Sequence, residues 1–219
     1  MKNLKMLGVV FTSLVISVFA MHANAYTNIF VFGDSLSDNG NLSMAPGAPA
    51  GTPSRFTNGP VAVEIVAGAL GLALTPSDHL NGGFSGNNFA VAGAKAIDED
   101  GNEQTPDINL PTQVNAFLQI NGGQAPADAL YVVLIGGNDI RAAREIRAAT
   151  VFASTPEERQ AIRQAANASL TAAVISEQAQ IEKLIAAGAR PFVPPIPGLD
   201  QVDPLTSDNI WNIRELPKR

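Results

Sequence analysis

Residues 28–41 have the sequence NIFVFGDSLSDNGN, and this stretch decides the fold. Its opening apolar run, rich in β-branched and aromatic residues, stops at Gly33 and predicts a strand buried on both faces, as in a parallel sheet. Ligands of open parallel sheets bind beyond the carboxyl ends of the strands, so Ser35 is a candidate nucleophile. A helix beginning there would direct its N–H groups at the serine oxygen and favour negative charge on it. An ordinary helix N-cap serine has the same local sequence.

Three other stretches have the character of strands. Tyr131–Ile135 is apolar and is followed by Gly136 and Gly137, so it repeats the first pattern. Pro191–Pro194 is shorter, with prolines typical of a strand that ends in a rigid loop. Phe89–Val91 is a fourth candidate.

Two amphipathic helices are predicted between these strands, over Val61–Leu72 and Pro156–Ala187. The apolar residues of the first are Val61, Ile65, Ala69 and Leu72. In the second, Thr155 and Glu158 form a capping box and Gly188 follows as the C-terminal cap. Its apolar stripe, expected to pack on a sheet, consists of Ile162, Ala166, Leu170, Val174, Ile181 and Ile185. Alternating strands and helices predict an α/β fold with a parallel sheet.

The composition excludes several classes of protein. The 219 residues include no cysteine, which rules out a disulfide scaffold, a thiol nucleophile, zinc–thiolate sites and iron–sulfur clusters. Lys and Arg total 14 against 20 Asp and Glu, a net charge of −6. There is no basic surplus to neutralise phosphates, so we expect no nucleic-acid partner.

The first 25 residues have the pattern of a secretory signal peptide. Lys2 and Lys5 precede an apolar run over Met6–Met21, and the small residues of Ala23-Asn24-Ala25 fit a cleavage site. The alternative, a membrane anchor, is disfavoured because the run is shorter than the ~20 residues that span a bilayer. We therefore expect a signal peptide at residues 1–25, one domain over residues 26–219, and a secreted or periplasmic location.

The segment GDSLSDNGN, residues 33–41, resembles block I of the GDSL, or SGNH, family of serine esterases and lipases. Three later stretches fit the family in the same order: RFTNGP at residues 55–60, NFAVAGA at residues 88–94 (block II) and IGGND at residues 135–139 (block III). The resemblance implies a three-layer α/β/α, flavodoxin-like fold around a parallel sheet.

The resemblance also implies roles for individual residues. Ser35 would be the nucleophile, and its backbone N–H, the N–H of Gly93 and the side-chain amide of Asn138 would form the oxyanion hole. Fixed donors at a developing oxyanion are usually the largest catalytic contribution, and glycine lets the backbone approach a substrate closely. Asp34 and Asp139 would brace these loops by hydrogen bonds. The implied reaction is hydrolysis of a small-molecule or lipid ester, with transient contact with membrane lipid, no cofactor and no metal.

One part of the family pattern is not found in this sequence. The family's general base is a histidine three residues after an aspartate, and no histidine follows Asn138. We interpret the chain as a truncated member that lacks the family's last strand and helix. Loss of a triad histidine lowers turnover about a millionfold, so the chain alone is expected to be nearly inert. His79 is expected in a polar surface loop before block II, a poor place for a substitute base.

Two functions therefore stay open. The chain is either a GDSL-type ester hydrolase whose base comes from missing sequence, or a catalytically inactive homologue that binds acyl esters. A third possibility, an exported sugar- or peptide-binding protein, is disfavoured because aromatic residues make up only 6% of the chain. The sequence does not indicate an oligomeric state.

Overall fold

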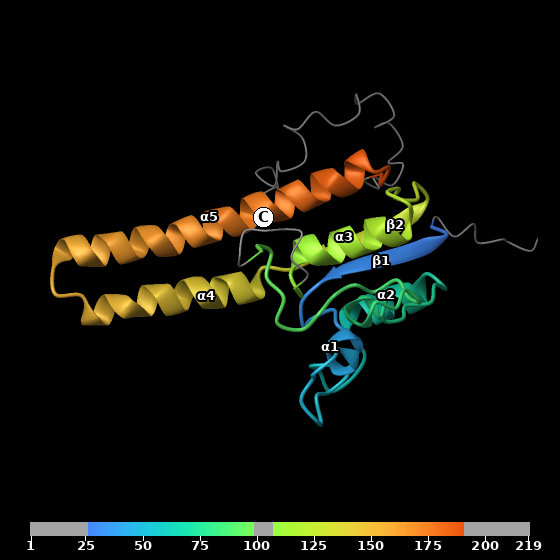
Figure 1. Ribbon diagram of the computed structural model, residues 1–219, viewed down its shortest axis with the longest axis horizontal. Helices are drawn as coiled ribbons and strands as arrows, with labels where there is room; N and C mark the ends of the chain where they lie inside the picture. The colour runs from blue at the N-terminus through green and yellow to red at the C-terminus, as the bar shows by residue number, and fades with distance from the viewer. Residues whose placement is uncertain (1–25, 99–106, 191–219) are drawn as a thin grey trace, which may run out of the picture.

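The computed structural model describes residues 26–98 and 107–190 of the chain. Two strands in these segments, β1 (Asn28–Gly33) and β2 (Ala129–Leu134), pair in parallel and in register from Asn28 opposite Ala129 to Gly33 opposite Leu134. A chain that mixes helices with a parallel sheet is an α/β protein, so the predicted fold class is confirmed (Figure 1).

The two strands differ in burial. From Ile29 onwards β1 is buried at every residue, as predicted for a strand covered on both faces. β2 was expected to match it, and this was wrong. Its middle residues are only half-buried and Leu134 is 41% exposed. The physical reason is position, because β2 lies at the edge of the described sheet and β1 has a neighbour on each side.

The second neighbour of β1 is the segment around the predicted strand Phe89–Val91. The N–H of Val31 donates to the carbonyl of Asn87 at 3.1 Å, and the N–H of Phe89 donates to the carbonyl of Val31 at 2.7 Å. Asn88 in this segment forms two isolated parallel bridges, to Val31 and to Pro76, and the segment is not a regular strand. The remaining predicted strand, Pro191–Pro194, lies outside the described residues.

Helices cover both faces of the sheet, which gives the three expected layers. α2 (Ala62–Ala69) lies on one side of β1 and α3 (Leu110–Ile120) on the other (Figure 1). The core on the α2 side includes Ile29, Val31, Val61, Val63 and Ala67. The core on the α3 side is richer in aromatic residues and includes Phe30, Phe32, Phe89, Val114 and Phe117. Alternate residues of β1 thus belong to opposite cores.

α2 differs from its prediction in length and in orientation. It ends at Ala69 instead of Leu72, and the buried residues within it are Val63 and Ala67. Ile65, assigned to the buried stripe, is 63% exposed. The helix packs on the sheet through the i, i+4 pair Val63 and Ala67, and this pair turns Ile65 towards solvent.

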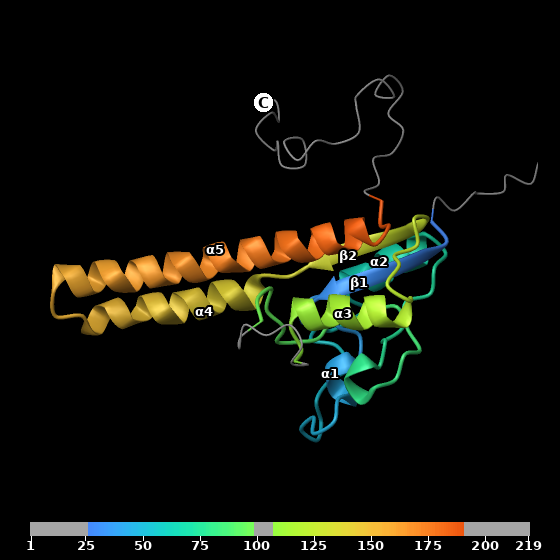
Figure 2. The same ribbon diagram turned by 45° about the horizontal axis from the view of Figure 1, so that its top comes forward.

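The long predicted helix is confirmed as α5 (Pro156–Ala186). Its capping box forms, since the N–H of Glu158 donates to Thr155 Oγ1 at 3.1 Å and the N–H of Thr155 donates to the Glu158 carboxylate at 3.2 Å. With α4 (Gly137–Ala148) and the short helix η2 (Ala149–Phe152), it forms a hairpin that extends well past the sheet (Figures 1 and 2).

The predicted apolar stripe of α5 is only partly correct. Ala166 is buried, but Val174 and Ile185 are exposed. The buried residues of the helix are Ala166, Ala173, Gln180 and Leu184. Much of α5 lies beyond the sheet and packs against α4. Small residues on its buried face allow the two helices to approach each other closely, which the larger branched residues would prevent. No helix in the described part of the chain is both long and apolar enough to span a membrane.

Candidate active site

The chain leaves β1 through a single tight turn. The N–H groups of Ser37 and Asp38 both donate to the carbonyl of Asp34 at 3.0 Å, and the Asp34 carboxylate accepts the N–H of Leu36 at 3.0 Å. The regular helix α1 (Asn41–Met44) begins only six residues after Ser35. Ser35 is therefore presented by a turn and not by a helix N-terminus. Its side chain is half-buried and makes no hydrogen bond within the described residues.

Asp38 fastens this turn to the second motif. Its buried carboxylate accepts the N–H groups of Gly40 and Asn41, both at 2.8 Å, and of Leu42 at 3.2 Å. The same carboxylate accepts the N–H of Ala92 at 2.8 Å. One side chain thus holds the loop after β1 against the residue that precedes Gly93.

Gly93 occupies a turn that requires glycine. Its φ of 92° lies in the region that other residues rarely adopt, and the residue is exposed. The neighbouring N–H groups are both paired: Ala92 donates to Asp38, and Ala94 donates to the carbonyl of Val91 at 3.1 Å. Gly93 itself is exposed, and its N–H has no acceptor within the described residues.

Asn138 lies in the first turn of α4 and reaches across to the same segment. Its Nδ2 donates to the carbonyl of Ala94 at 2.7 Å. Because a carboxamide nitrogen carries two hydrogens, this bond fixes the orientation of the side chain and leaves the second hydrogen available. The next residue, Asp139, accepts the N–H of Ala96 through Oδ2 at 2.9 Å. The expected bracing role of Asp139 is thus visible in its contacts.

The third connection joins the first motif to the last. The Asp34 carboxylate lies close to the backbone of Gly137, next to Asn138, and the N–H group of Gly137 acts to lower the pKa of Asp34. Burial raises the pKa of Asp34 above its ordinary value and the nearby Asp139 adds to this, whereas the hydrogen bonds from Leu36 and Gly137 oppose it. Asp139 also contributes, after burial, to a raised pKa of Glu177 on α5. The three motifs are therefore linked pairwise by buried polar contacts.

Within these motifs, the backbone donors left without a partner are informative. On either side of Ser35, the N–H of Asp34 donates to the carbonyl of Leu134 and the N–H of Leu36 donates to Asp34. On either side of Gly93, the N–H groups of Ala92 and Ala94 are paired, as described above. Within the described segments, the N–H groups of Ser35 and Gly93 have no acceptor. Fixed N–H donors at the point where negative charge develops are what an oxyanion hole requires.

Two residues that hold this arrangement were missed by sequence reasoning. Gln113, fully buried on α3, accepts the N–H of Gly33 through Oε1 at 2.8 Å and donates to the carbonyl of Gly33 through Nε2 at 2.9 Å. Asn88 donates to the carbonyl of Ser37 at 2.7 Å. Gln113 belongs to a helix that we had not predicted, and only its apolar neighbours Val114 and Phe117 signalled a buried face.

His79 was expected on the surface, and this was wrong. It lies in the short helix η1 (His79–Asn81), is 9% exposed, and its ring lies 5.6 Å from the ring of Phe89. Its Nδ1 makes a 2.7 Å hydrogen bond with the hydroxyl of Ser77. Burial lowers its pKa to about 4, against a smaller opposing effect of Asp78. No hydrogen bond within the described segments connects it to Ser35.

Comparison with known proteins defines the class. Residues 29–215 match the family model described as GDSL-like lipase/acylhydrolase. The chain belongs to this family. Within residues 26–98 and 107–190, no group of three or more His, Cys, Asp or Glu side chains is placed to hold a metal ion.

The chain is similar to several curated proteins. It is 32% identical over 178 residues to "Lipase 1" of Photorhabdus luminescens, a match covering 80% of this chain and 23% of the relative. It is 31% identical over 145 residues to "Esterase EstA" of Pseudomonas aeruginosa, covering 52% and 22% respectively. "Acetylajmalan esterase 2" of Rauvolfia serpentina is 37% identical over 116 residues, covering 42% and 32%. The chain thus spans less than a third of the length of these relatives.

Proposed function

We propose that this chain carries the nucleophile and oxyanion hole of a carboxylic-ester hydrolase. The observation that carries the proposal is the pair of free N–H groups at Ser35 and Gly93, each between neighbours whose N–H groups are bonded. Asn138 supports it, because its amide is held beside Gly93 by the carbonyl of Ala94 with one hydrogen to spare. The family membership gives the reaction class.

In the proposed reaction, Ser35 Oγ attacks the ester carbonyl carbon and its proton passes to a base. The carbonyl oxygen becomes an oxyanion that accepts hydrogen bonds from the N–H groups of Ser35 and Gly93 and from Asn138 Nδ2. Collapse of this intermediate expels the alcohol and leaves an acyl-serine, which water then hydrolyses to the acid. No histidine follows Asn138 in these 219 residues, so the base is the component that this sequence does not supply.

The second candidate function, an acyl-ester-binding module without turnover, is favoured by that same lack of a histidine. Both candidates use Ser35 and the same oxyanion donors. They differ in whether a bound ester is turned over. A probe that reports on Ser35 and the oxyanion hole at equilibrium therefore has to be combined with one that reports on turnover.

Butylboronic acid provides the first probe, because its boron becomes tetrahedral and anionic when it bonds to the Ser35 oxygen, whose proton is released to the buffer at equilibrium. ¹¹B NMR should show this adduct with the wild-type chain and no adduct with Ser35→Ala. Asn138→Ala should weaken the adduct roughly 100- to 1,000-fold, as expected for loss of one oxyanion donor. Ser37→Ala, in the same turn, is the matched control and should retain the adduct. An adduct that survives Ser35→Ala would refute the site.

Hydrolysis of 4-nitrophenyl acetate provides the second probe. Release of nitrophenolate that Ser35→Ala abolishes supports the hydrolase. An adduct with butylboronic acid but no Ser35-dependent release supports the binding module instead. We propose small-molecule esters as the substrates, and transient contact with membrane lipid stays a prediction.

Export and domain extent are further proposals. The basic start, apolar run and Ala23-Asn24-Ala25 site support a signal peptide over residues 1–25, which lie outside the described residues. A secreted or periplasmic hydrolase domain over residues 26–219 follows from it. N-terminal sequencing of protein recovered from the periplasm or medium should begin at Tyr26, and an N-terminus at Met1 would contradict the proposal.

A further inference from the structure

Residues 94–96, directly after Gly93, are bonded to three helices. The start of α3 holds the middle residue of this segment. The N–H of Lys95 donates to Asn109 Oδ1 at 2.8 Å, and the carbonyl of Lys95 accepts the N–H of Leu110 at 3.0 Å. Both backbone groups of Lys95 are therefore fixed to one end of a helix that packs on the sheet.

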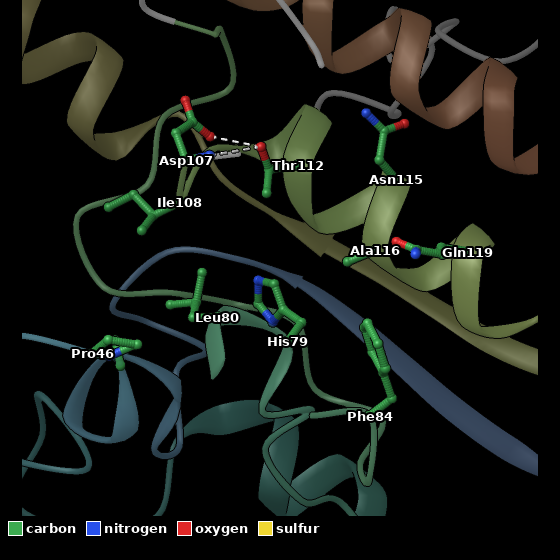
Figure 3. A pocket seen from close by; sticks show the side chains of 11 residues that line it. Pro46, His79, Leu80, Phe84, Asp107, Ile108, Thr112, Asn115, Ala116 and Gln119 are labelled. Atoms are coloured by element: carbon green, nitrogen blue, oxygen red, sulfur yellow. Dashed lines mark hydrogen bonds between the residues drawn. The ribbon is translucent and has the colours of Figure 1, made fainter. Parts of the chain in front are cut away.

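The start of α3 is itself braced. The N–H of Asn109 donates to Asp107 Oδ1 at 2.6 Å, and the hydroxyl of Thr112 donates to the same oxygen at 2.9 Å (Figure 3). Ile108 also contacts the segment before Lys95, since its side chain lies 3.5 Å from the position that a Cβ would take on Gly93. This support is therefore rigid.

The α4–α5 hairpin holds the last residue of the segment through both of its helices. The N–H of the buried Ala96 donates to Asp139 on α4, as described above. Its carbonyl accepts the hydroxyl of Ser176 on α5 at 2.6 Å, across 80 residues of sequence. With the contacts of Ala94, all six backbone N–H and C=O groups of residues 94–96 are hydrogen-bonded.

The contact of Ser176 differs from the usual one for a hydroxyl within a helix. Such a side chain often donates to the carbonyl four residues earlier, as Thr171 does to Asn167 at 3.0 Å. Ser176 instead donates outside its own helix. It lies three residues after the buried Ala173 and four before the buried Gln180, so it belongs to the buried face of α5. Its hydroxyl therefore serves the loop and not the helix.

Gly93 depends on its neighbours for its position. Glycine has the greatest conformational freedom of any residue, and the N–H of Gly93 has no acceptor within the described residues. Its orientation is therefore set by Ala92, which Asp38 holds, and by residues 94–96. A displacement of about 1 Å in a catalytic group can lower a rate about 100-fold, so the bonds of this segment matter for an oxyanion hole.

We propose that Ser176 is a positioning residue of the oxyanion hole. Its bond to the carbonyl of Ala96 fixes the end of the segment and thereby directs the N–H of Gly93 at the oxyanion. This role rests on the proposed function, since it concerns the same oxyanion hole. Ser176 acts through Ala96 and does not touch the ester, so it affects the affinity for an anionic adduct without contributing a contact to it.

Titration with butylboronic acid, followed by ¹¹B NMR on chains whose folding is checked by circular dichroism, tests this role. Ser176→Ala should weaken the adduct roughly 10-fold, less than the loss of a whole donor in Asn138→Ala. Ser176→Thr keeps the hydroxyl and should restore the wild-type affinity. Ser169→Ala, seven residues earlier and therefore on the same face of α5, is the matched control and should bind as the wild type does.

The amide of Gly93 gives a direct measurement. In ¹H–¹⁵N spectra at saturating butylboronic acid, the Gly93 proton of the wild type should move downfield, as expected for a new hydrogen bond to the boronate oxygen. The displacement should be smaller in Ser176→Ala. This comparison decides the role of the hydroxyl even if Ser176→Thr does not fold.

The outcomes separate this role from the proposed function. A wild-type chain that forms no adduct would overturn the proposed function and, with it, the role of Ser176. An adduct of equal affinity and equal Gly93 displacement in the wild type and Ser176→Ala would overturn the role of Ser176 alone. A lower free energy of unfolding in Ser176→Ala with that unchanged adduct would show that the hydroxyl serves only stability.

Discussion

The loops at the ends of β1 and β2 and the α4–α5 hairpin are stabilised in different ways. Around these loops, buried polar side chains such as Asp38, Asn88 and Gln113, the last on α3, bond directly to backbone groups. In the hairpin, three of the six buried residues are alanines (Ala143, Ala166 and Ala173), and large apolar side chains such as Val151 and Phe152 face solvent. A site that must position hydrogen-bond donors needs directional bonds, whereas two helices need only a close approach. Substitutions should therefore cost most in the loops and least at the hairpin tip.

The largest expected effect is that of Asp38→Ala. This change leaves four backbone N–H groups without their carboxylate acceptor, those of Gly40, Asn41 and Leu42 and that of Ala92. Charge-assisted bonds in a buried site are among the strongest in proteins, so the free energy of unfolding should fall by about 4 kcal/mol. Urea denaturation followed by circular dichroism measures it. Glu145→Ala, which removes an exposed carboxylate from the hairpin, should change stability by less than about 0.5 kcal/mol. Equal losses in the two variants would abolish the distinction between the regions.

The next effect is a pH dependence that belongs to the loop region. The pKa of His79 is about 4 in the folded chain and 6.5 for an ordinary histidine. Between these values the unfolded chain binds a proton that the folded chain does not, so this contribution is complete above pH 6.5 and is lost as the pH falls towards 4. The contribution of His79 to the free energy of unfolding over this range is about 3 kcal/mol. It is measured as the difference between wild type and His79→Gln in urea denaturation from pH 7 to pH 4, with the histidine titrated by NMR. A His79 pKa near 6.5 would contradict it.

The same contrast explains which parts were predictable from the sequence. The apolar run Asn28–Phe32 predicted β1, because such a run is stable only when it is buried. Thr155 and Glu158 predicted the start of α5, because capping depends only on neighbouring residues. The buried face of α5 could not be predicted, since the helix packs against α4 and η2 along its first part and against α3 near its end. Leu134 was expected to be buried, and it is exposed for a similar reason. Whether a strand is central or at an edge depends on its neighbours and not on its own residues.

The site shows the same limit. Short motifs with glycine, aspartate and asparagine identified the loops that carry Ser35, Gly93 and Asn138, whose catalytic roles stay predictions. Neither Gln113 nor the burial of His79 was visible, because each depends on contacts between segments far apart in the chain. Gln113 and Gly33 are separated by 80 residues. Polar residues at such positions look like solvent-exposed ones until the fold brings their partners together.

The third expected effect is that of Gln113→Leu. Leucine fills similar space but leaves the buried N–H of Gly33 without its acceptor, and the carbonyl of Ile108 loses the donor at 2.9 Å. An unsatisfied buried group costs about 1–3 kcal/mol, so the expected loss is about 2 kcal/mol in urea denaturation. Gln119→Leu, on the exposed part of the same helix, is the control and should change stability little. A Gln113→Leu variant as stable as wild type would show that the side chain does not hold the end of β1.

The smallest effect is expected at the hairpin tip, with Phe152→Ser. The side chain is 87% exposed and η2 has no buried residue, so little packing is lost and the free energy of unfolding should change by less than about 0.5 kcal/mol. Solubility should increase, because an exposed phenylalanine beside the exposed Val151 favours association between chains. Light scattering over a concentration series measures the second effect. A fall of more than about 1 kcal/mol in the free energy of unfolding, with no change in association, would mean that Phe152 is packed in solution. The hairpin and the loops would then differ less than we infer.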